Sequence, residues 1–151
     1  MRRLGLVLVF LSLVFALACS QRTGPPLPPP NPTLLSSPSG RPLSHSGGGV
    51  TVEVLAVRLP SAGQGSAEFK LALDTHSVDL DAYDLKNGVR LRDDRGNELA
   101  PGTVDVPLGG HHREGTVTFE GPALASAKYV ELMVRGLAGV PERSFRWEVA
   151  Q

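Results

Sequence analysis

Apolar and polar residues alternate in short runs from Val50 to the end of the chain. An alternation with a period of two places apolar side chains on one face of a β-strand and polar side chains on the other. No stretch of this region has the longer apolar period of an extended amphipathic helix, and one short helical turn is expected over 122–128. The pattern predicts about seven strands, over 50–59, 69–73, 89–91, 104–106, 117–119, 130–134 and 145–149.

Two local features add detail to this pattern. The first run changes face part of the way along, because Leu55, Val57 and Leu59 continue it at the opposite parity. Such a change predicts a β-bulge or a kink in that strand. The residues Asp-Arg-Gly-Asn at 94–97 predict a hairpin turn between the third run and Leu99.

Strands that are apolar on one face need a second sheet to cover that face. We therefore expect an all-β fold, an immunoglobulin-like antiparallel β-sandwich of about seven strands in Greek-key order, with a small open barrel as the alternative. The only cysteine is Cys19, so this sandwich would lack the disulfide of antibody domains. A lone cysteine also excludes zinc fingers built on cysteine pairs and thioredoxin-type redox chemistry.

The first eighteen residues have the layout of a secretory signal peptide. Arg2 and Arg3 precede an apolar run over 4–15, and small residues then lead to Cys19. The run is shorter than the roughly 20 residues that a transmembrane helix needs. We expect a cleaved signal over 1–18, which directs the rest of the chain out of the cytoplasm.

The segment Ala16-Leu17-Ala18-Cys19 resembles the lipobox of bacterial lipoproteins. The resemblance implies that the Cys19 thiol receives a diacylglycerol and that the signal is cut before it. It also implies acylation of the new amine, for example by palmitate. The mature chain would then be anchored to the bacterial cell membrane or outer membrane. A plain signal peptide with an incidental cysteine and an uncleaved anchor are the alternatives.

Residues 19–49 differ in composition from the rest of the chain. They contain GPPLPPPNP and then SSPSGRPLSHSGGG, with no apolar periodicity. Proline-rich and Gly/Ser-rich segments of this kind behave as spacers. We therefore expect a disordered tether over 19–49, in which His45 is solvated, followed by the β-sandwich domain over 50–151.

Charge and aromatic content exclude some classes of partner. The whole chain has 15 basic and 15 acidic residues, and loss of Arg2 and Arg3 with the signal would leave a net charge of −2. Nucleic-acid binding needs a clustered basic face, which this balance does not provide. Aromatic residues make up 5% of the chain, too few for base-stacking platforms.

Three strings in the domain are similar to a group of uncharacterised bacterial exported proteins with an immunoglobulin-like domain. They are THSVDLDAYDL, VRLRDDRGNEL and GGHHREGTVTF, within residues 69–120. The resemblance implies the same fold and export. It implies no activity, and it marks these polar stretches as parts of one recurring module.

Two of these polar stretches lie at strand ends and carry three of the four histidines. Imidazole and carboxylate groups together suit Zn²⁺ or Cu²⁺ when three or four of them converge. Adjacent histidines on a regular strand point to opposite faces, so convergence needs a turn, which Gly109-Gly110 could provide. If the two loops meet, the predicted metal ligands are His76, Asp79, His111 and His112.

The alternative for the same loops is a polar network without a ligand. Arg113, Glu114 and Asp81 would then hold the loops together by hydrogen bonds and ion pairs. A looser calcium site from the nearby aspartates Asp74, Asp79, Asp81 and Asp84 also stays open, although the spacing is not that of an EF-hand.

No motif in the chain indicates catalysis. Ser77, His76 and Asp79 are neighbours in sequence, without the nucleophile elbow of a hydrolase. The sequence favours a membrane-anchored envelope lipoprotein with a non-catalytic β-sandwich, used for contact with another envelope protein or for structural support. An extracytoplasmic zinc or copper module is the alternative function.

Overall fold

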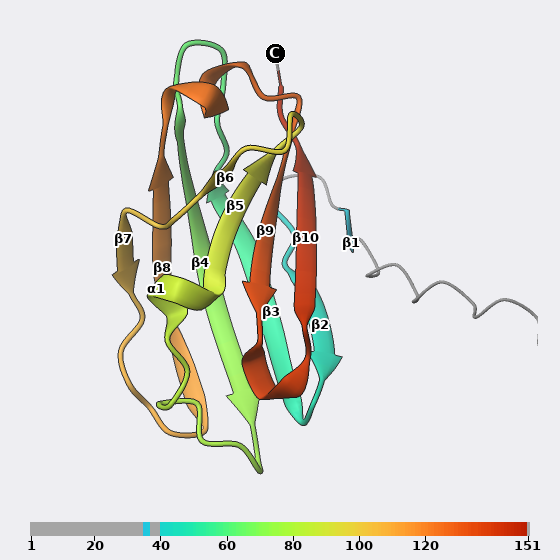
Figure 1. Cartoon of the computed structure of the whole chain (residues 1–151), viewed down its shortest axis with the longest axis vertical. Coiled ribbons are helices and arrows are strands. Elements are labelled where there is room, and N and C mark those ends of the chain that lie inside the picture. The colour runs from blue at the N-terminus through green and yellow to red at the C-terminus, as the bar shows by residue number, and fades with distance from the viewer. Residues whose placement is uncertain (1–34, 37–39, 151) are drawn as a thin grey trace, which may run out of the picture. The chain divides into compact units, whose positions relative to one another are not determined.

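The chain folds into two β-sheets packed face to face (Figure 1). The structure is a computed structural model that describes residues 35–36 and 40–150. The expected signal peptide, Cys19 and most of the expected tether lie outside these residues. One sheet has the order β1 (Leu35–Ser36), β10 (Glu142–Glu148), β9 (Tyr129–Arg135), β5 (Val89–Asp93) and β6 (Glu98–Leu99). The other has the order β2 (Leu43–Gly47), β3 (Val50–Arg58), β4 (Ser66–Thr75), β8 (His112–Glu120) and β7 (Thr103–Asp105).

The topology is that of an immunoglobulin-like sandwich, as predicted. The order β3-β4-β8-β7 in one sheet faces β5-β9-β10 in the other, which is the order of the A-B-E-D and C-F-G strands of that fold. All neighbouring strands are antiparallel except β1, which pairs in parallel with β10. No helix in the described part of the chain is both long and apolar enough to span a membrane.

Each of the seven predicted runs overlaps a strand, and β4, β5, β8 and β9 are longer than their runs. The structure adds β1, β2 and β6, each of five residues or fewer. Strand β2 extends the sheet into the segment that the sequence assigned to the tether, and it pairs residue by residue with the first half of β3. His45, expected to be solvated, lies half-buried in β2, and its buried Nδ1 has no hydrogen-bond partner. The ordered sandwich therefore begins before Val50.

The core lies between the sheets and is filled by the apolar faces of the alternating runs. Phe69 of β4 contacts both Phe119, in an edge-on arrangement with ring centroids 6.1 Å apart, and Trp147, at 5.0 Å. These three aromatic side chains are fully buried. Since Trp147 is the only tryptophan, its fluorescence reports on the centre of the fold.

The predicted bulge is present in β3, but the face does not change as expected. The pairing with β4 shifts register between Ala56 and Arg58, which leaves Val57 unpaired. Ala56 keeps the inward orientation of the preceding valines, whereas Leu55 is half-buried and Val57 is 55% exposed. The bulge therefore absorbs one residue at the end of the strand.

The local turns follow their sequence signals. Residues 94–97 form the predicted hairpin, which pairs Leu91 with Leu99, and Gly96 takes the left-handed conformation at φ +83°. A 3₁₀-helix, η1 (Pro122–Ser126), occupies the predicted helical turn. The structure adds a one-turn α-helix, α1 (Leu85–Gly88), and a second 3₁₀-helix, η2 (Leu137–Gly139).

Candidate functional site

The two polar loops singled out in the sequence meet at one end of the sandwich, at the bottom of Figure 1. One loop follows β4 and the other precedes β8. Beyond the last paired residues of these strands, the amide of Thr75 donates to the carbonyl of His111 at 3.0 Å. The amide of Leu80 donates to the carbonyl of Gly110 at 2.9 Å. These two bonds join the loops backbone to backbone.

Asp81 fixes the turn before β8 with both of its carboxylate oxygens. Oδ1 accepts from the amide of Gly109 at 2.9 Å, and Oδ2 accepts from the amide of Gly110 at 3.1 Å. The Gly109 amide is the main reason that the pKa of Asp81 lies below its ordinary value. Both glycines are needed, because Gly110 has φ +62° and a Cβ on Gly109 would collide with the carbonyl oxygen of His112.

Arg113 holds the loops from inside the sandwich, where it is 5% exposed. Its guanidinium donates to four backbone carbonyls: Leu80 at 2.8 Å, Tyr83 at 3.1 Å, Val106 at 3.1 Å and Pro107 at 3.1 Å. Its nearest carboxylate oxygen, Oδ1 of Asp81, is 4.0 Å from Nε. The buried charge is therefore satisfied mainly by carbonyl dipoles of both loops.

The turn between β2 and β3 is joined to the same end of the molecule. The Thr75 hydroxyl donates to the carbonyl of Gly49 at 2.7 Å, and it accepts from the amides of Ser77 and Val78 at 3.1 and 3.2 Å. His111 Nδ1 lies 3.3 Å from the carbonyl oxygen of Val78. Three separate chain segments are thus tied together by hydrogen bonds to backbone groups.

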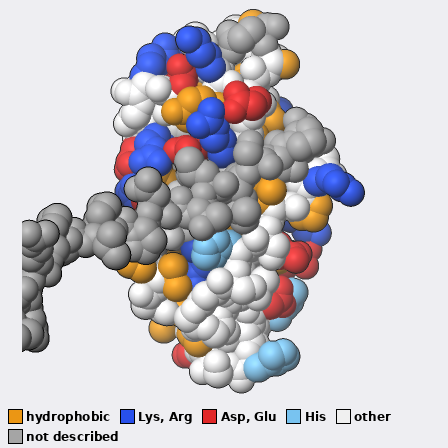
Figure 2. Space-filling model, turned by 90° about the vertical axis from the view of Figure 1, so that its right-hand side faces the viewer, with side chains coloured by type: hydrophobic (Ala, Val, Ile, Leu, Met, Phe, Trp, Pro, Cys, Tyr) orange, Lys and Arg blue, Asp and Glu red, His pale blue; other side chains and the backbone are white. Residues whose placement is uncertain are grey.

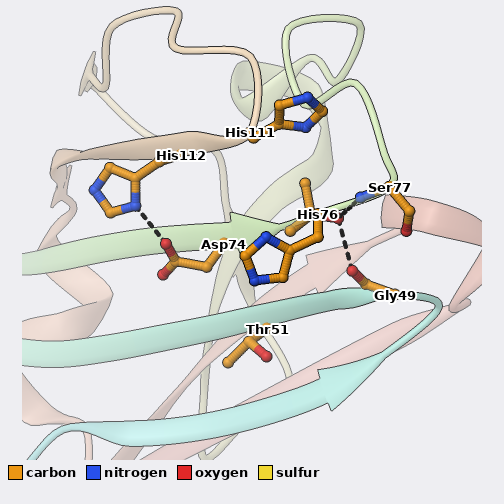
Figure 3. A pocket seen from close by; sticks show the side chains of 8 residues that line it. Gly49, Thr51, Asp74, His76, Ser77, His111 and His112 are labelled. Carbon is orange, nitrogen blue, oxygen red and sulfur yellow. Dashed lines mark hydrogen bonds and ion pairs between the residues drawn. The ribbon is translucent and has the colours of Figure 1, made fainter.

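An open depression of about 410 Å³ lies beside this network, on the outer side of the sheet (Figure 3). On the face shown in Figure 2, histidine side chains lie near the middle and along the lower right edge, where acidic side chains are close by. All three histidines of the two polar stretches line the depression, although they come from different segments. Its lining includes Thr51, Asp74, His76, Ser77, His111 and His112.

His112 is paired with carboxylates on either side. Its Nδ1 is hydrogen-bonded to Oδ1 of Asp74, drawn as a dashed line in Figure 3. This bond is the main reason that the pKa of His112 is raised. Its Nε2 lies 3.5 Å from Oε2 of Glu114. The pKa of Glu114 is lowered, chiefly by its bond to the ammonium group of Lys70.

The aspartates of the first loop cap turns. Asp79 accepts a hydrogen bond from the amide of Asp81 at 3.0 Å. Asp84 is the N-cap of α1 and accepts from the amides of Lys86 and Asn87 at 3.0 and 3.3 Å. These two carboxylates are thereby engaged with backbone amides of their own turns.

The predicted metal ligands come together only in part. His76, His111 and His112 share the rim of the depression, but Asp79 is outside it. Within residues 35–36 and 40–150, no three histidine, aspartate or glutamate side chains are grouped so that they could hold a metal ion. Of the predicted loop network, Asp81 and Arg113 join the loops, whereas Glu114 lies on the sheet face with Lys70.

A fully buried arginine, Arg143, is not among the residues singled out from the sequence. Arg143 is fully buried and donates to the carbonyls of Leu137 at 3.0 Å and Gly47 at 2.7 Å, while its Nε has no partner. Burial lowers its pKa. The alternation of Phe145 and Trp147 on β10 places residue 143 on the inner face, so this signal could have found it.

The fold and the joined loops define the chain as a small all-β sandwich protein. At one end, the buried Arg113 and the exposed Asp81 stabilise the loops by hydrogen bonds to backbone groups. Comparison with protein-family models and with curated proteins finds no match to this chain. The function must therefore be argued from the chain's own residues.

Proposed function

We propose that this chain is an exported lipoprotein, anchored to a bacterial envelope membrane by lipid on Cys19, and that its sandwich is a non-catalytic module that binds another envelope protein. The observation that carries the anchor is the position of the only cysteine, directly after a basic and apolar leader and two small residues. Two or more acyl chains at one site give stable membrane attachment, at roughly 0.8 kcal/mol per buried methylene.

Residues 20–34 would separate the lipid on Cys19 from β1, which begins at Leu35. The described sandwich therefore begins inside the tether expected over 19–49.

The joined loops suit the binding of a partner. His76 and His111 are exposed, while the backbone that carries them is fixed by hydrogen bonds across the loops. A surface that is ordered before binding loses less conformational entropy when a partner docks. We therefore assign the partner-binding role to this end of the sandwich.

The anchor is tested by comparing wild type with Cys19→Ala in a bacterial host. We expect the wild-type chain in the membrane fraction with incorporation of labelled palmitate. The Cys19→Ala chain should incorporate no label and be lost from the membrane fraction. Cys19→Ala with undiminished label and membrane recovery would refute lipidation at this residue.

The partner-binding role is tested by site-specific photocrosslinking in living cells. A photoreactive residue at position 76 or 111 should give the same discrete protein adduct. Glu148 is the control, since its side chain is 66% exposed and it is on β10, away from these loops. Absence of any adduct at positions 76 and 111, or an identical adduct pattern at all three positions, would contradict the role.

A further inference from the structure

Three acidic and imidazole side chains form a row on the outer face of the β4–β8 pair. The strand register places Asp74 opposite His112, and Glu114 follows two residues later on β8. Side chains two residues apart on a strand point to the same face. All three are accessible, with exposed side-chain fractions of 48% for Asp74, 58% for His112 and 40% for Glu114.

Of the two ring nitrogens of His112, Nδ1 is bonded to Asp74 and Nε2 faces Oε2 of Glu114. Nδ1 is held by Asp74, so in the neutral ring the proton is placed on Nδ1 and the lone pair on Nε2. Histidines that bind metals very often donate their other ring N–H to a carboxylate, which orients the ring and makes it more basic. Asp74 occupies the position of the carboxylate that accepts this N–H.

In the neutral ring, the lone pair of Nε2 has a carboxylate oxygen beside it, at a distance that suits an ion bound by both atoms. His112 Nε2 and Glu114 Oε2 are 3.5 Å apart. Two ligands at the usual zinc–nitrogen and zinc–oxygen distances, with a tetrahedral angle between them, are separated by about 3.4 Å. The observed separation therefore matches a chelating pair.

We propose that His112 Nε2 and Glu114 Oε2 together bind a divalent transition-metal ion such as Zn²⁺ or Cu²⁺, with Asp74 as a positioning residue. This site differs from the set predicted from the sequence, since it uses a strand glutamate and one histidine. Water completes the coordination, because the protein supplies two ligands. Imidazole with carboxylate is a donor pair that suits both ions.

Lys70 opposes metal binding, and this gives the proposal a specific test. Its ammonium group pairs with Oε1 of Glu114, the oxygen that the metal does not use. A positive charge so close to the ion weakens binding by electrostatic repulsion. Glu53 lines the adjoining depression of about 200 Å³ with Lys70 and Glu114 and partly offsets that charge. Removal of the Lys70 charge should therefore strengthen the site.

The experiment uses the full chain, extracted in mild detergent and carrying no polyhistidine tag. Isothermal titration with Zn²⁺ should give one ion per chain. We expect His112→Ala and Glu114→Gln each to weaken binding at least tenfold. Lys70→Gln should tighten it severalfold. Asp74→Asn should weaken it less than His112→Ala, because it disorients the ring without removing a ligand.

Two matched controls separate this site from the other histidines and from general charge effects. His111→Ala removes the neighbouring imidazole, and Glu68→Gln removes a carboxylate of the same sheet that pairs with Arg58. Both should bind Zn²⁺ as the wild type does. Imidazole NMR signals should show Zn²⁺ at Nε2 of His112.

Some results would overturn the proposal. They are an absence of Zn²⁺ binding by the wild type at millimolar concentrations, full affinity in His112→Ala, or weaker binding in Lys70→Gln. Trp147 fluorescence shows whether each variant is folded. If His112→Ala does not fold, Glu114→Gln tests the same site. The lipid anchor is scored separately by membrane fractionation.

Discussion

Replacement of Arg113 by methionine tests whether this residue holds the two loops together. Methionine keeps most of the side-chain length and apolar contact but removes every donor. The bonds to Leu80 and Val106 are buried, so their carbonyls would lose a partner out of reach of water. A buried acceptor left unsatisfied costs about 1–3 kcal/mol. Removal of the guanidinium also relieves the cost of burying a charge, which offsets part of this loss.

The expected net loss for Arg113→Met is about 2–4 kcal/mol in the free energy of unfolding. It can be measured by urea titration with the fluorescence of the buried Trp147 as the signal. Arg58→Met is the matched control, since Arg58 is 52% exposed and makes one surface ion pair, with Glu68. Such pairs contribute about 0–1 kcal/mol. If the two variants differ by less than about 1 kcal/mol, Arg113 does not stabilise the loops as argued.

Three further predictions concern the same end of the sandwich and the position at which the fold begins. Because the pKa of Asp81 is lowered in the folded state, its contribution to stability is present above its unfolded-state pKa and is lost as the pH falls through its folded-state pKa. In Asp81→Asn, the free energy of unfolding should therefore fall less steeply with decreasing pH below about pH 4. Gly109→Ala should lower the free energy of unfolding, measured by urea titration, by about 1–3 kcal/mol, because the new Cβ meets the His112 carbonyl oxygen. A Cβ on Gly110 meets no atom within 4 Å. A chain that begins at Val50 should unfold at lower urea than one that begins at Gly40, because it lacks β2, and equal midpoints would contradict a structural role for that strand.

The sequence predicted the sandwich well because the inner faces of the longer strands are mainly apolar. Seven runs met that condition, and each overlaps a strand. Strand β2 was missed because its inward positions are Leu43, His45 and Gly47, of which only the first is clearly apolar. Strands β1 and β6 have two residues each, too few for an alternation to be visible.

The sequence singled out the two polar loops but did not give the partners of their side chains. The metal ligands were predicted for the case that the two loops meet, and the loops do meet. The partner of each side chain depends on the strand register, which a single sequence does not specify. A one-residue shift between β4 and β8 would remove Asp74 from its place opposite His112. Asp79 was grouped with the histidines by proximity in sequence, but its carboxylate accepts a hydrogen bond from its own turn.

Alternation along β8 also separates two roles in adjacent residues. Arg113 points inward and holds the loops through their carbonyls, whereas His112 and Glu114 point outward, where their substitution leaves the core untouched. Changes at 112 and 114 should therefore alter metal binding with little effect on unfolding, and changes at 113 should do the reverse. Loss of stability in His112→Ala equal to that in Arg113→Met would show that the two faces of the strand are not independent.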